Sequence, residues 1–219
     1  MTLSLYAHPF SSYCQKVLCA LYENATPFTL CLVEFDDSDT TREFTALWPV
    51  GRMPVLVDAG HTVVESSIII EHLQNRNPGP VRLIPADPET ALDVRKLDRI
   101  FDNYVMTPMQ AIVFDAMRPA DQRDAGSVAK ARTLLDTAYD WIDRNLQDRH
   151  WAAGEDFTLA DCAAAPALFY ADWVHPIGAA RAALRDYRAR LLARPSFARA
   201  VDEARPYRHF FPPGAPDRD

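Results

Sequence analysis

Hydrophobic residues follow two different spacings along the chain, one on each side of the proline-rich stretch 80–88. Before this stretch, short runs of β-forming residues alternate with segments in which hydrophobic residues recur every three or four positions. After it, only the helical spacing is found. The pattern predicts an α+β chain with a mixed domain over residues 1–79, a linker over 80–88, an all-helical domain over 89–211 and a tail over 212–219.

The mixed region is predicted to alternate strands and helices in the order βαβαββα. Strands are expected at 2–6, 28–33, 53–58 and 62–64. Helices are expected to begin at Ser11-Ser12, at Thr41 and at Glu65. The first two strands should be parallel, because a helix separates them and serves as the crossover connection.

Three local features add detail to this region. Ala59-Gly60 is expected to form the turn of a β-hairpin. Ile68, Ile69 and Leu73 are expected to share one side of the third helix. The acidic stretch 34–39 predicts a solvated loop.

The second region is predicted to be entirely helical. Hydrophobic stripes indicate helices at 89–106, 127–146, 179–193 and 196–204. The first stripe includes Tyr104 and should bend or break at Thr107-Pro108. Thr158 and Asp161 have the spacing of a capping box before an alanine-rich helix, which gives Asp161 a structural role. The stretch 212–216, rich in proline, is expected to be disordered.

Composition narrows the possible classes of function. The net charge of −7 argues against a nucleic-acid surface, which needs a basic face. The run Ile68–Ile70 is interrupted by Glu71 and is too short to span a membrane. The four cysteines show no metal-ligand spacing, and free thiols are typical of a reducing compartment. With no signal-peptide pattern at the start, we expect a cytoplasmic protein without a bound metal.

The stretch from Tyr6 to Val17 is predicted to be a strand-to-helix turn with Ser11 and Ser12 at the start of the helix. A helix N-terminus has unpaired N–H groups and a partial positive charge, so it stabilises an anion such as a thiolate. The spacing Ser11-x-x-Cys14 resembles a thioredoxin Cys-x-x-Cys motif whose first cysteine is replaced by serine. Serine is also a favoured N-cap, which stabilises a helix by ~1 kcal/mol without any catalysis.

Two further stretches carry candidate chemistry. The Met53-Pro54 bond is either an ordinary trans bond or a cis bond, which would turn the Met53 backbone outward to pair with an extended peptide. Glu65 and Ser66 lie where the third helix begins. Glu65 could simply stabilise the helix. Alternatively, the Ser66 hydroxyl and N–H could bind a carboxylate while Glu65 pairs with an ammonium group, and an α-amino acid carries both.

Over nearly its whole length the sequence resembles the glutathione transferases. The matching segments, in order, are His8-Pro9-Phe10-Ser11-x-x-Cys14-x-Lys16-Val17, Gly51-Arg52-Met53-Pro54-Val55-Leu56, Val64-Glu65-Ser66-x-x-Ile69-x-Glu71-His72-Leu73 and Phe157-Thr158-Leu159-Ala160-Asp161. The resemblance implies a thioredoxin-like N-terminal domain that binds glutathione, a helical domain that lines the pocket for the electrophile, and a homodimer. It implies glutathione as a co-substrate and no permanently bound cofactor.

The resemblance also implies roles for individual residues. The family's catalytic serine precedes the valine of the first helix by six positions, which corresponds to Ser11, with Ser12 as the second choice. Cys14 corresponds to the second thioredoxin cysteine and, without its partner, is interpreted as a buried small side chain. Glutathione-binding positions would be Arg52, Met53, Pro54, Glu65 and Ser66, and the electrophile pocket would include Phe10, Tyr104 and Met109.

The sequence leaves the chemistry open between three alternatives. The first is conjugation of the glutathione thiolate to a hydrophobic electrophile. The second is a glutathione-dependent isomerase or dehalogenase on the same scaffold, because a fold does not determine its chemistry. The third is a regulatory protein that binds glutathione without turnover. Ser11 and Glu65-Ser66 favour an active site over the third alternative.

Overall fold

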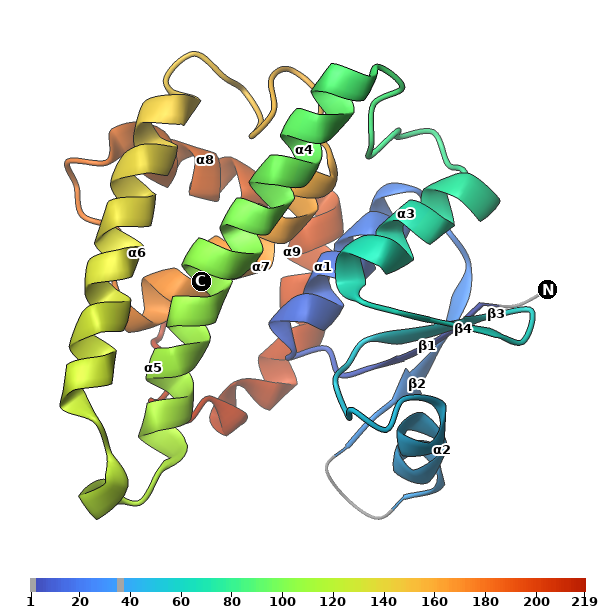
Figure 1. The fold of residues 1–219 in the computed structure, drawn as a ribbon, viewed down its shortest axis with the longest axis horizontal. Helices are drawn as coiled ribbons and strands as arrows, with labels where there is room; N and C mark the ends of the chain where they lie inside the picture. Colours follow the sequence, from blue (N-terminus) through green and yellow to red (C-terminus); the bar gives the residue numbers. More distant parts are fainter. Residues whose placement is uncertain (1–2, 35–37) are drawn as a thin grey trace.

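The computed structural model describes residues 3–34 and 38–219 (Figure 1). Four strands form one sheet in the order β2-β1-β3-β4: β1 Leu3–Ala7, β2 Phe28–Leu32, β3 Val55–Asp58 and β4 His61–Val64. β1 and β2 are parallel, and β3 is antiparallel to both β1 and β4. The predicted parallel pair and hairpin are confirmed. β3 begins two residues later than predicted, because Pro54 has no N–H for a ladder hydrogen bond.

Three helices cover the sheet, and the order βαβαββα is confirmed. α1 (Ser12–Glu23) and α3 (Ser66–Arg76) lie on one face, and α2 (Asp39–Leu47) lies on the other (Figure 1). The buried side chain of Phe44 joins α2 to Val33 and Val55. Asp39, predicted in a loop, begins α2 because the Ser38 side chain caps it by accepting from the Thr41 N–H. Residues 35–37 of the predicted loop and residue 2 of the first strand lie outside the described residues.

The buried side of α3 differs from the prediction. Ile69, Ile70 and Leu73 are buried, whereas 54% of Ile68 is exposed. Residues 68 and 73 are about 140° apart around a helix of 3.6 residues per turn, so they cannot share one side. The placement of Ile68 on the buried side was therefore wrong, and Ile70 takes its place.

The segment between the two regions has no helix or strand from residue 77 to 87, but it is packed on the protein. Leu83 and Ile84 are buried, and the Leu83 carbonyl accepts a hydrogen bond of 2.8 Å from the Leu159 N–H. The segment is therefore held against the helical region.

The second region begins with one long helical column (Figure 1). α4 (Pro88–Ile100) continues through a π-helical segment, Phe101–Met106, into α5 (Thr107–Met117). Pro108 does not break the column; it is the second residue of α5 and directly follows the π-helical segment. In the wider π-helical turn each residue advances less around the axis. Val105 and Met106 are therefore buried, and Tyr104, predicted in the buried stripe, is 50% exposed.

The remaining helices enclose a buried central helix, α7. The elements that follow α5 are a short 3₁₀ turn Ala120–Gln122, α6 (Ala125–Leu146), α7 (Leu159–Val174), α8 (Ala182–Ala193), α9 (Pro195–Ala204) and a 3₁₀ segment Arg205–Phe210. Both hydrogen bonds of the predicted capping box between Thr158 and Asp161 are present. α8 begins three residues later than predicted, because residues 179–180 form a turn and Arg181 is the N-cap. None of the described helices is both long and hydrophobic enough to cross a bilayer.

The C-terminal tail packs on the helical region, so the prediction of disorder at 212–216 was wrong. Phe211 is buried, and Ala215 packs against the hydrophobic core. Arg218 forms an ion pair with Asp172 of α7, and Asp219 accepts from Arg205 at 2.5 Å. These ion pairs hold a segment whose local composition gives no regular structure.

Candidate active site

Three of the sequence stretches meet at one end of the sheet. β1 and β3 are antiparallel with Tyr6 opposite Val55, and Val55 also lies opposite Val64 of β4. The end of β1, the start of β3 and the end of β4 are therefore neighbours. The segments that continue from them are the turn 8–11, the Met53–Pro54 peptide and Glu65.

Ser11 is the N-cap residue of α1 by its backbone, but its side chain does not act as a cap. Its φ and ψ of −80° and 125° are extended, and its carbonyl accepts from the Gln15 N–H at 2.9 Å. Within residues 3–34 and 38–219, its hydroxyl makes no capping hydrogen bond to the helix. Ser12 is the first residue of α1 and is 8% exposed, less than Ser11. Ser11 is therefore the more accessible of the two serines.

Cys14 is completely buried beside Ser11. Burial raises the pKa of the Cys14 thiol to about 12, and hydrogen bonds with the Ser11 side chain and the His8 backbone oppose this only in part. The thiol therefore stays protonated near neutral pH, and the thiolate that nucleophilic or redox chemistry requires is not formed. His8 has its pKa lowered by burial, and its Nδ1 accepts from the Phe10 N–H at 3.1 Å.

Glu65 and Ser66 begin α3 on the same edge. Glu65 is exposed and has a positive φ of 70°, and in the described part of the chain its carboxylate makes no capping hydrogen bond to α3. Ser66, the first helical residue, is 6% exposed. The pKa of the Tyr13 phenol in α1 is raised to about 12 by burial, with smaller effects from the carboxylates of Asp102 and Glu65. Glu65 therefore lies near the first turn of α1.

The segment before β3 completes this edge. The Met53–Pro54 peptide bond is cis, and Pro54 is buried. Arg52 is exposed in the loop that precedes it. The five predicted glutathione-binding residues therefore come from two segments, which meet where β3 pairs with β4.

A buried group of charges links this edge to the helical region, and sequence reasoning did not find it. The fully buried Lys16 forms ion pairs with Asp98 at 2.5 Å and Asp102 at 2.8 Å and donates to the Ser67 hydroxyl at 2.9 Å. Arg99 also pairs with Asp98, at 2.9 Å. Burial raises the pKa of Asp102, and Lys16 opposes this. The sequence signal was a lysine among buried positions of α1, because lysine is almost never fully buried without a partner.

The three predicted pocket residues differ in how much of each side chain is exposed. Phe10 is half-buried and packs edge to face on Tyr170 and Phe211, with ring centroids 5.6 Å and 6.3 Å away. Tyr104 is exposed, and Met109 is only 4% exposed. The ring contacts of Phe10 are thus with Tyr170 of α7 and with Phe211, and the sequence singled out neither residue.

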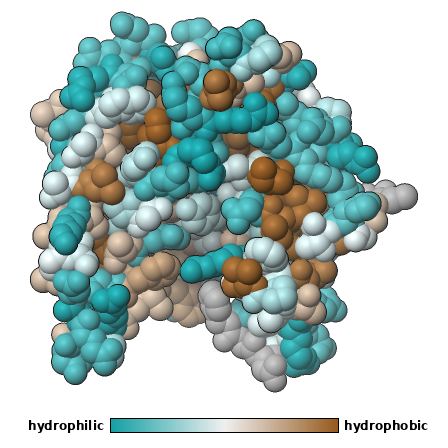
Figure 2. Space-filling view, viewed as in Figure 1, coloured by the Kyte–Doolittle hydropathy of each residue, from teal (hydrophilic) through white to brown (hydrophobic). Residues whose placement is uncertain are grey.

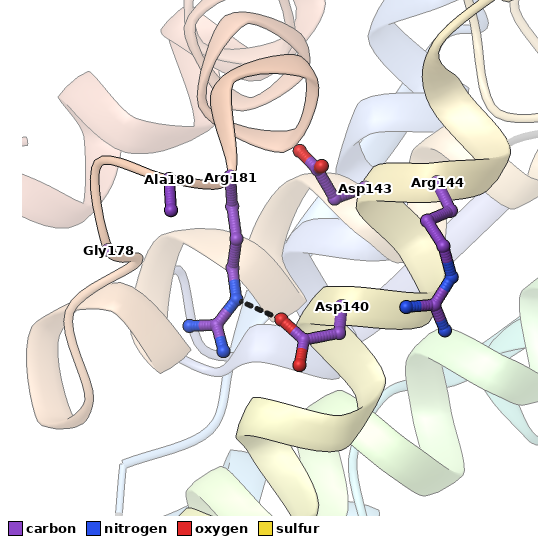
Figure 3. Close-up of a pocket in the computed structure, with 6 residues that line it drawn as sticks. All are labelled: Asp140, Asp143, Arg144, Gly178, Ala180 and Arg181. Carbon is purple, nitrogen blue, oxygen red and sulfur yellow. Dashed lines mark hydrogen bonds and ion pairs between the residues drawn. The ribbon is translucent and has the colours of Figure 1, made fainter.

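A hollow of about 320 Å³ lies between α6 and α8, within the helical region. Figure 3 shows the side chains that line it. The guanidinium of Arg181 pairs with Asp140 at 2.6 Å and Asp136 at 3.0 Å. Asp143 accepts from the Leu184 N–H at 2.9 Å and so caps α8 from a neighbouring helix. These charges stabilise helix packing. In the described part of the chain, no group of three or more His, Cys, Asp or Glu side chains could hold a metal ion.

Comparisons with known proteins match both regions. A family model described as glutathione S-transferase, N-terminal domain, covers residues 5–81. A second, described as glutathione S-transferase, C-terminal domain, covers residues 105–195. Together they include the sheet edge, the last part of the helical column from residue 105 onward, and α7.

Similar individual proteins cover most of the chain. A glutathione S-transferase structure from Methylobacterium radiotolerans, in complex with glutathione sulfonate, is 32% identical with a TM-score of 0.78, covering 92% of this chain and 95% of that one. A glutathione S-transferase structure from Methylobacillus flagellatus with glutathione bound is 25% identical with a TM-score of 0.79, covering 91% and 98%. FtsZ-localized protein A of Caulobacter vibrioides is 31% identical over 182 residues, covering 78% of this chain and 77% of that protein.

Proposed function

The chain belongs to the glutathione S-transferase family, and from this premise we propose that it conjugates the thiolate of glutathione to a hydrophobic electrophile. The observation that carries the proposal is the Ser11 hydroxyl, which lies at the N-terminus of α1 and, among the described residues, makes no capping hydrogen bond to that helix. Two similar structures hold glutathione or its sulfonate. The proposed site is the sheet edge formed by the turn 8–11, the Met53–Pro54 peptide and the start of α3.

Ser11 stabilises the thiolate as a hydrogen-bond donor. A free thiol has a pKa of ~8.5 and is mostly protonated at neutral pH, whereas the thiolate is the nucleophile. A hydroxyl that donates to the sulfur favours the anion and lowers its pKa. The N-terminus of α1 acts in the same direction through its unpaired N–H groups and its dipole. Ser12 is the second choice for this donor.

The start of α3 binds the γ-glutamyl end of glutathione. The Ser66 hydroxyl and backbone N–H donate to the carboxylate, and the Glu65 carboxylate pairs with the ammonium group. Glu65 is exposed, and over residues 3–34 and 38–219 its carboxylate makes no capping hydrogen bond to α3, which supports this role. The Met53 backbone beside Pro54 pairs with the peptide, and Arg52 lies toward the glycyl end.

The electrophile occupies the space next to the turn, where Phe10, Tyr104 and Met109 are the proposed lining residues. Phe10 forms the near wall, because it is half-buried and fixed by aromatic neighbours. Met109, with only 4% of it exposed, belongs to the hydrophobic core against which Phe10 packs. Holding the electrophile close to the sulfur supplies much of the rate.

A second copy of the chain is the proposed partner. Ile68 of α3 and Leu92 of α4 are 54% and 62% exposed, and Arg95 and Glu71 form an ion pair of 2.8 Å between the two helices. Figure 2 shows hydrophobic patches over α3 and α4 on this face, set among hydrophilic residues. A homodimer would cover them. The cytoplasm is the proposed location, because the thiols are free.

Turnover of glutathione with a generic aryl halide, measured beside retention on immobilised glutathione, tests the proposed function. We expect both retention and turnover. Retention without turnover on a panel of electrophiles would favour a non-catalytic glutathione-binding protein. Loss of both would contradict the proposal. Product analysis separates conjugation from isomerisation or dehalogenation on the same fold.

A further inference from the structure

Two backbone carbonyls just before Ser11 accept hydrogen bonds from buried side chains outside the turn. Gln15 Nε2 donates to the Pro9 carbonyl at 3.0 Å. The Tyr170 hydroxyl, which comes from α7 in the helical region, donates to the Phe10 carbonyl at 3.0 Å. Gln15 Nε2 also donates to the Tyr170 oxygen at 3.1 Å. We call Gln15 and Tyr170 the turn clamp.

The number of available protons fixes the direction of each bond in the clamp. An amide NH₂ group has two hydrogens, and Gln15 uses one on Pro9 and one on Tyr170. The phenol has one hydrogen, which it gives to Phe10. Burial raises the pKa of Tyr170, so the phenol keeps its proton. Gln15 is 0% exposed and Tyr170 is 3% exposed, so water does not compete for these positions.

The clamp holds two successive peptide planes at both ends. A peptide unit is planar, so the carbonyl of one residue and the N–H of the next are rigidly linked. In the first plane, Gln15 holds the Pro9 carbonyl while the Phe10 N–H donates to His8 Nδ1. In the second plane, Tyr170 holds the Phe10 carbonyl while the Ser11 N–H donates to the His8 carbonyl at 3.0 Å.

We propose that Tyr170 is a positioning residue that sets the orientation of Ser11, acting with Gln15 through the Pro9–Phe10 and Phe10–Ser11 peptide planes. The inference rests on the proposed function for its effect on catalysis. Its structural part, the fixing of the turn, does not depend on glutathione. The helical region thereby sets the geometry of a site built on the sheet domain, across 160 residues of sequence.

The test compares Tyr170→Phe with a matched control, Tyr139→Phe. Tyr139 in α6 is also fully buried, and its hydroxyl also donates to a backbone carbonyl, that of His175, at 3.2 Å. Both changes remove one buried hydroxyl and keep the ring. Only Tyr170→Phe should make the amide hydrogens of Phe10 and Ser11 exchange faster in the free protein, by about fivefold, since one lost hydrogen bond of ~1 kcal/mol shifts an opening equilibrium by roughly that factor.

In the presence of glutathione, only Tyr170→Phe should raise the pKa of the bound thiol and lower turnover near neutral pH several-fold. The loss should shrink above pH ~9, where the thiol ionises unaided. The KM for glutathione should stay within about twofold, because the α3 contacts are untouched. Gln15→Met removes both amide donors and keeps a similar side-chain volume, so it should reproduce the faster amide exchange. It provides the test if Tyr170→Phe does not fold.

The two hypotheses fail in different ways. If the wild-type protein neither retains glutathione nor turns it over, the proposed function fails, while the exchange of the Phe10 and Ser11 amides still reports on the clamp. If these amides exchange at the same rate in Tyr170→Phe, or in Gln15→Met where that is the variant that folds, as in Tyr139→Phe, the hypothesis that the turn clamp fixes the turn is overturned. If exchange changes while the pKa of bound glutathione and the pH profile stay at the wild-type values, Tyr170 has a structural role only and the positioning proposal is overturned.

Discussion

The Nζ atom of Lys16 in α1 lies 2.8 Å from Oδ2 of Asp102 in the π-helical segment, with the lysine side chain completely buried. The same Nζ lies 2.5 Å from Asp98 Oδ1. One cation from the sheet domain is therefore enclosed by two carboxylates of the helical region. A buried ion pair offers little net stability over hydrophobic residues, but removal of one partner leaves an uncompensated buried charge. The pairing therefore ties the two regions together in one arrangement.

We expect Lys16→Met to destabilise the protein strongly. Asp98 and Asp102 would remain buried next to Arg99, which is half exposed, without the lysine between them. The expected loss in the free energy of unfolding is ~3–5 kcal/mol, measured by urea denaturation. Lys96→Met is the control, because the Lys96–Asp93 pair is exposed and contributes at most ~1 kcal/mol. Equal losses in the two variants would show that the buried pair has no special role.

We expect Glu65→Ala and Ser66→Ala each to weaken glutathione binding and leave the fold intact. A charge-assisted hydrogen bond is worth ~1.5–3 kcal/mol, so affinity should fall roughly tenfold or more. Calorimetry measures the affinity. Glu89→Ala is the matched control, because Glu89 is also an exposed acidic residue in the first turn of a helix, α4. Unchanged affinity would remove the γ-glutamyl assignment, and loss of folding would show that the two residues only begin α3.

We expect sedimentation to show a homodimer rather than a 24.7 kDa species at micromolar concentration. Ile68→Lys should shift the protein toward the monomer, because it places a charge on the exposed face of α3. Leu134→Lys, on an exposed position of α6, is the control and should leave the dimer unchanged. A wild-type protein that sediments only as a monomer would contradict the proposed partner.

The elements that the sequence predicted well depend on local patterns. The stripe of α6 and the Thr158–Asp161 capping box are set by residues a few positions apart, and both are present. Tyr104 was misplaced because a hydrophobic stripe does not indicate a π-helical turn, which changes the phase of every later position. The tail was misjudged because its order comes from ion pairs with distant residues, such as that between Arg218 and Asp172.

In the candidate site, too, residues in short local motifs could be predicted, whereas contacts between distant residues could not. Ser11 and Glu65 could be singled out because each stands at a strand-to-helix junction, where a short motif carries the chemistry. Gln15 and Tyr170 could not be linked, because their hydrogen bond joins residues 155 positions apart. Lys16 was part of a recognised motif, but its two carboxylate partners come from the helical region. Contacts across the two regions follow from packing, which one sequence does not reveal.

We expect stability to fall as the pH rises from about 9 to 12. Burial raises the pKa of the Cys14 thiol and the Tyr13 phenol to about 12, whereas in an unfolded chain they ionise near ~8.5 and ~10. In this window the folded state holds protons that the unfolded state has released, so stability decreases with pH. Urea unfolding at several pH values measures this. In Cys14→Ala the decline should be shallower, while Cys162, whose pKa burial also raises, keeps part of it. A slope identical to that of the wild type would show that Cys14 contributes nothing.

The last prediction concerns Ser11. If its hydroxyl donates to the thiolate, Ser11→Ala should raise the pKa of bound glutathione and cut turnover near neutral pH, while affinity for glutathione changes little. The loss should shrink as pH rises, because hydroxide then ionises the thiol without help. Ser12→Ala is the matched control, since Ser12 is the neighbouring serine and is less exposed.

Ultraviolet titration of enzyme-bound glutathione decides between the two serines and a structural role. A raised pKa in Ser11→Ala alone supports Ser11 as the donor, and the same change in Ser12→Ala alone would transfer the role to Ser12. If Ser11 served only as an N-cap, its replacement would lower stability by ~1 kcal/mol and leave the titration in place. The structure argues against that outcome, because the Ser11 side chain makes no capping hydrogen bond within the described residues. An identical thiolate pKa in the wild type and both variants would end the claim that either serine is catalytic.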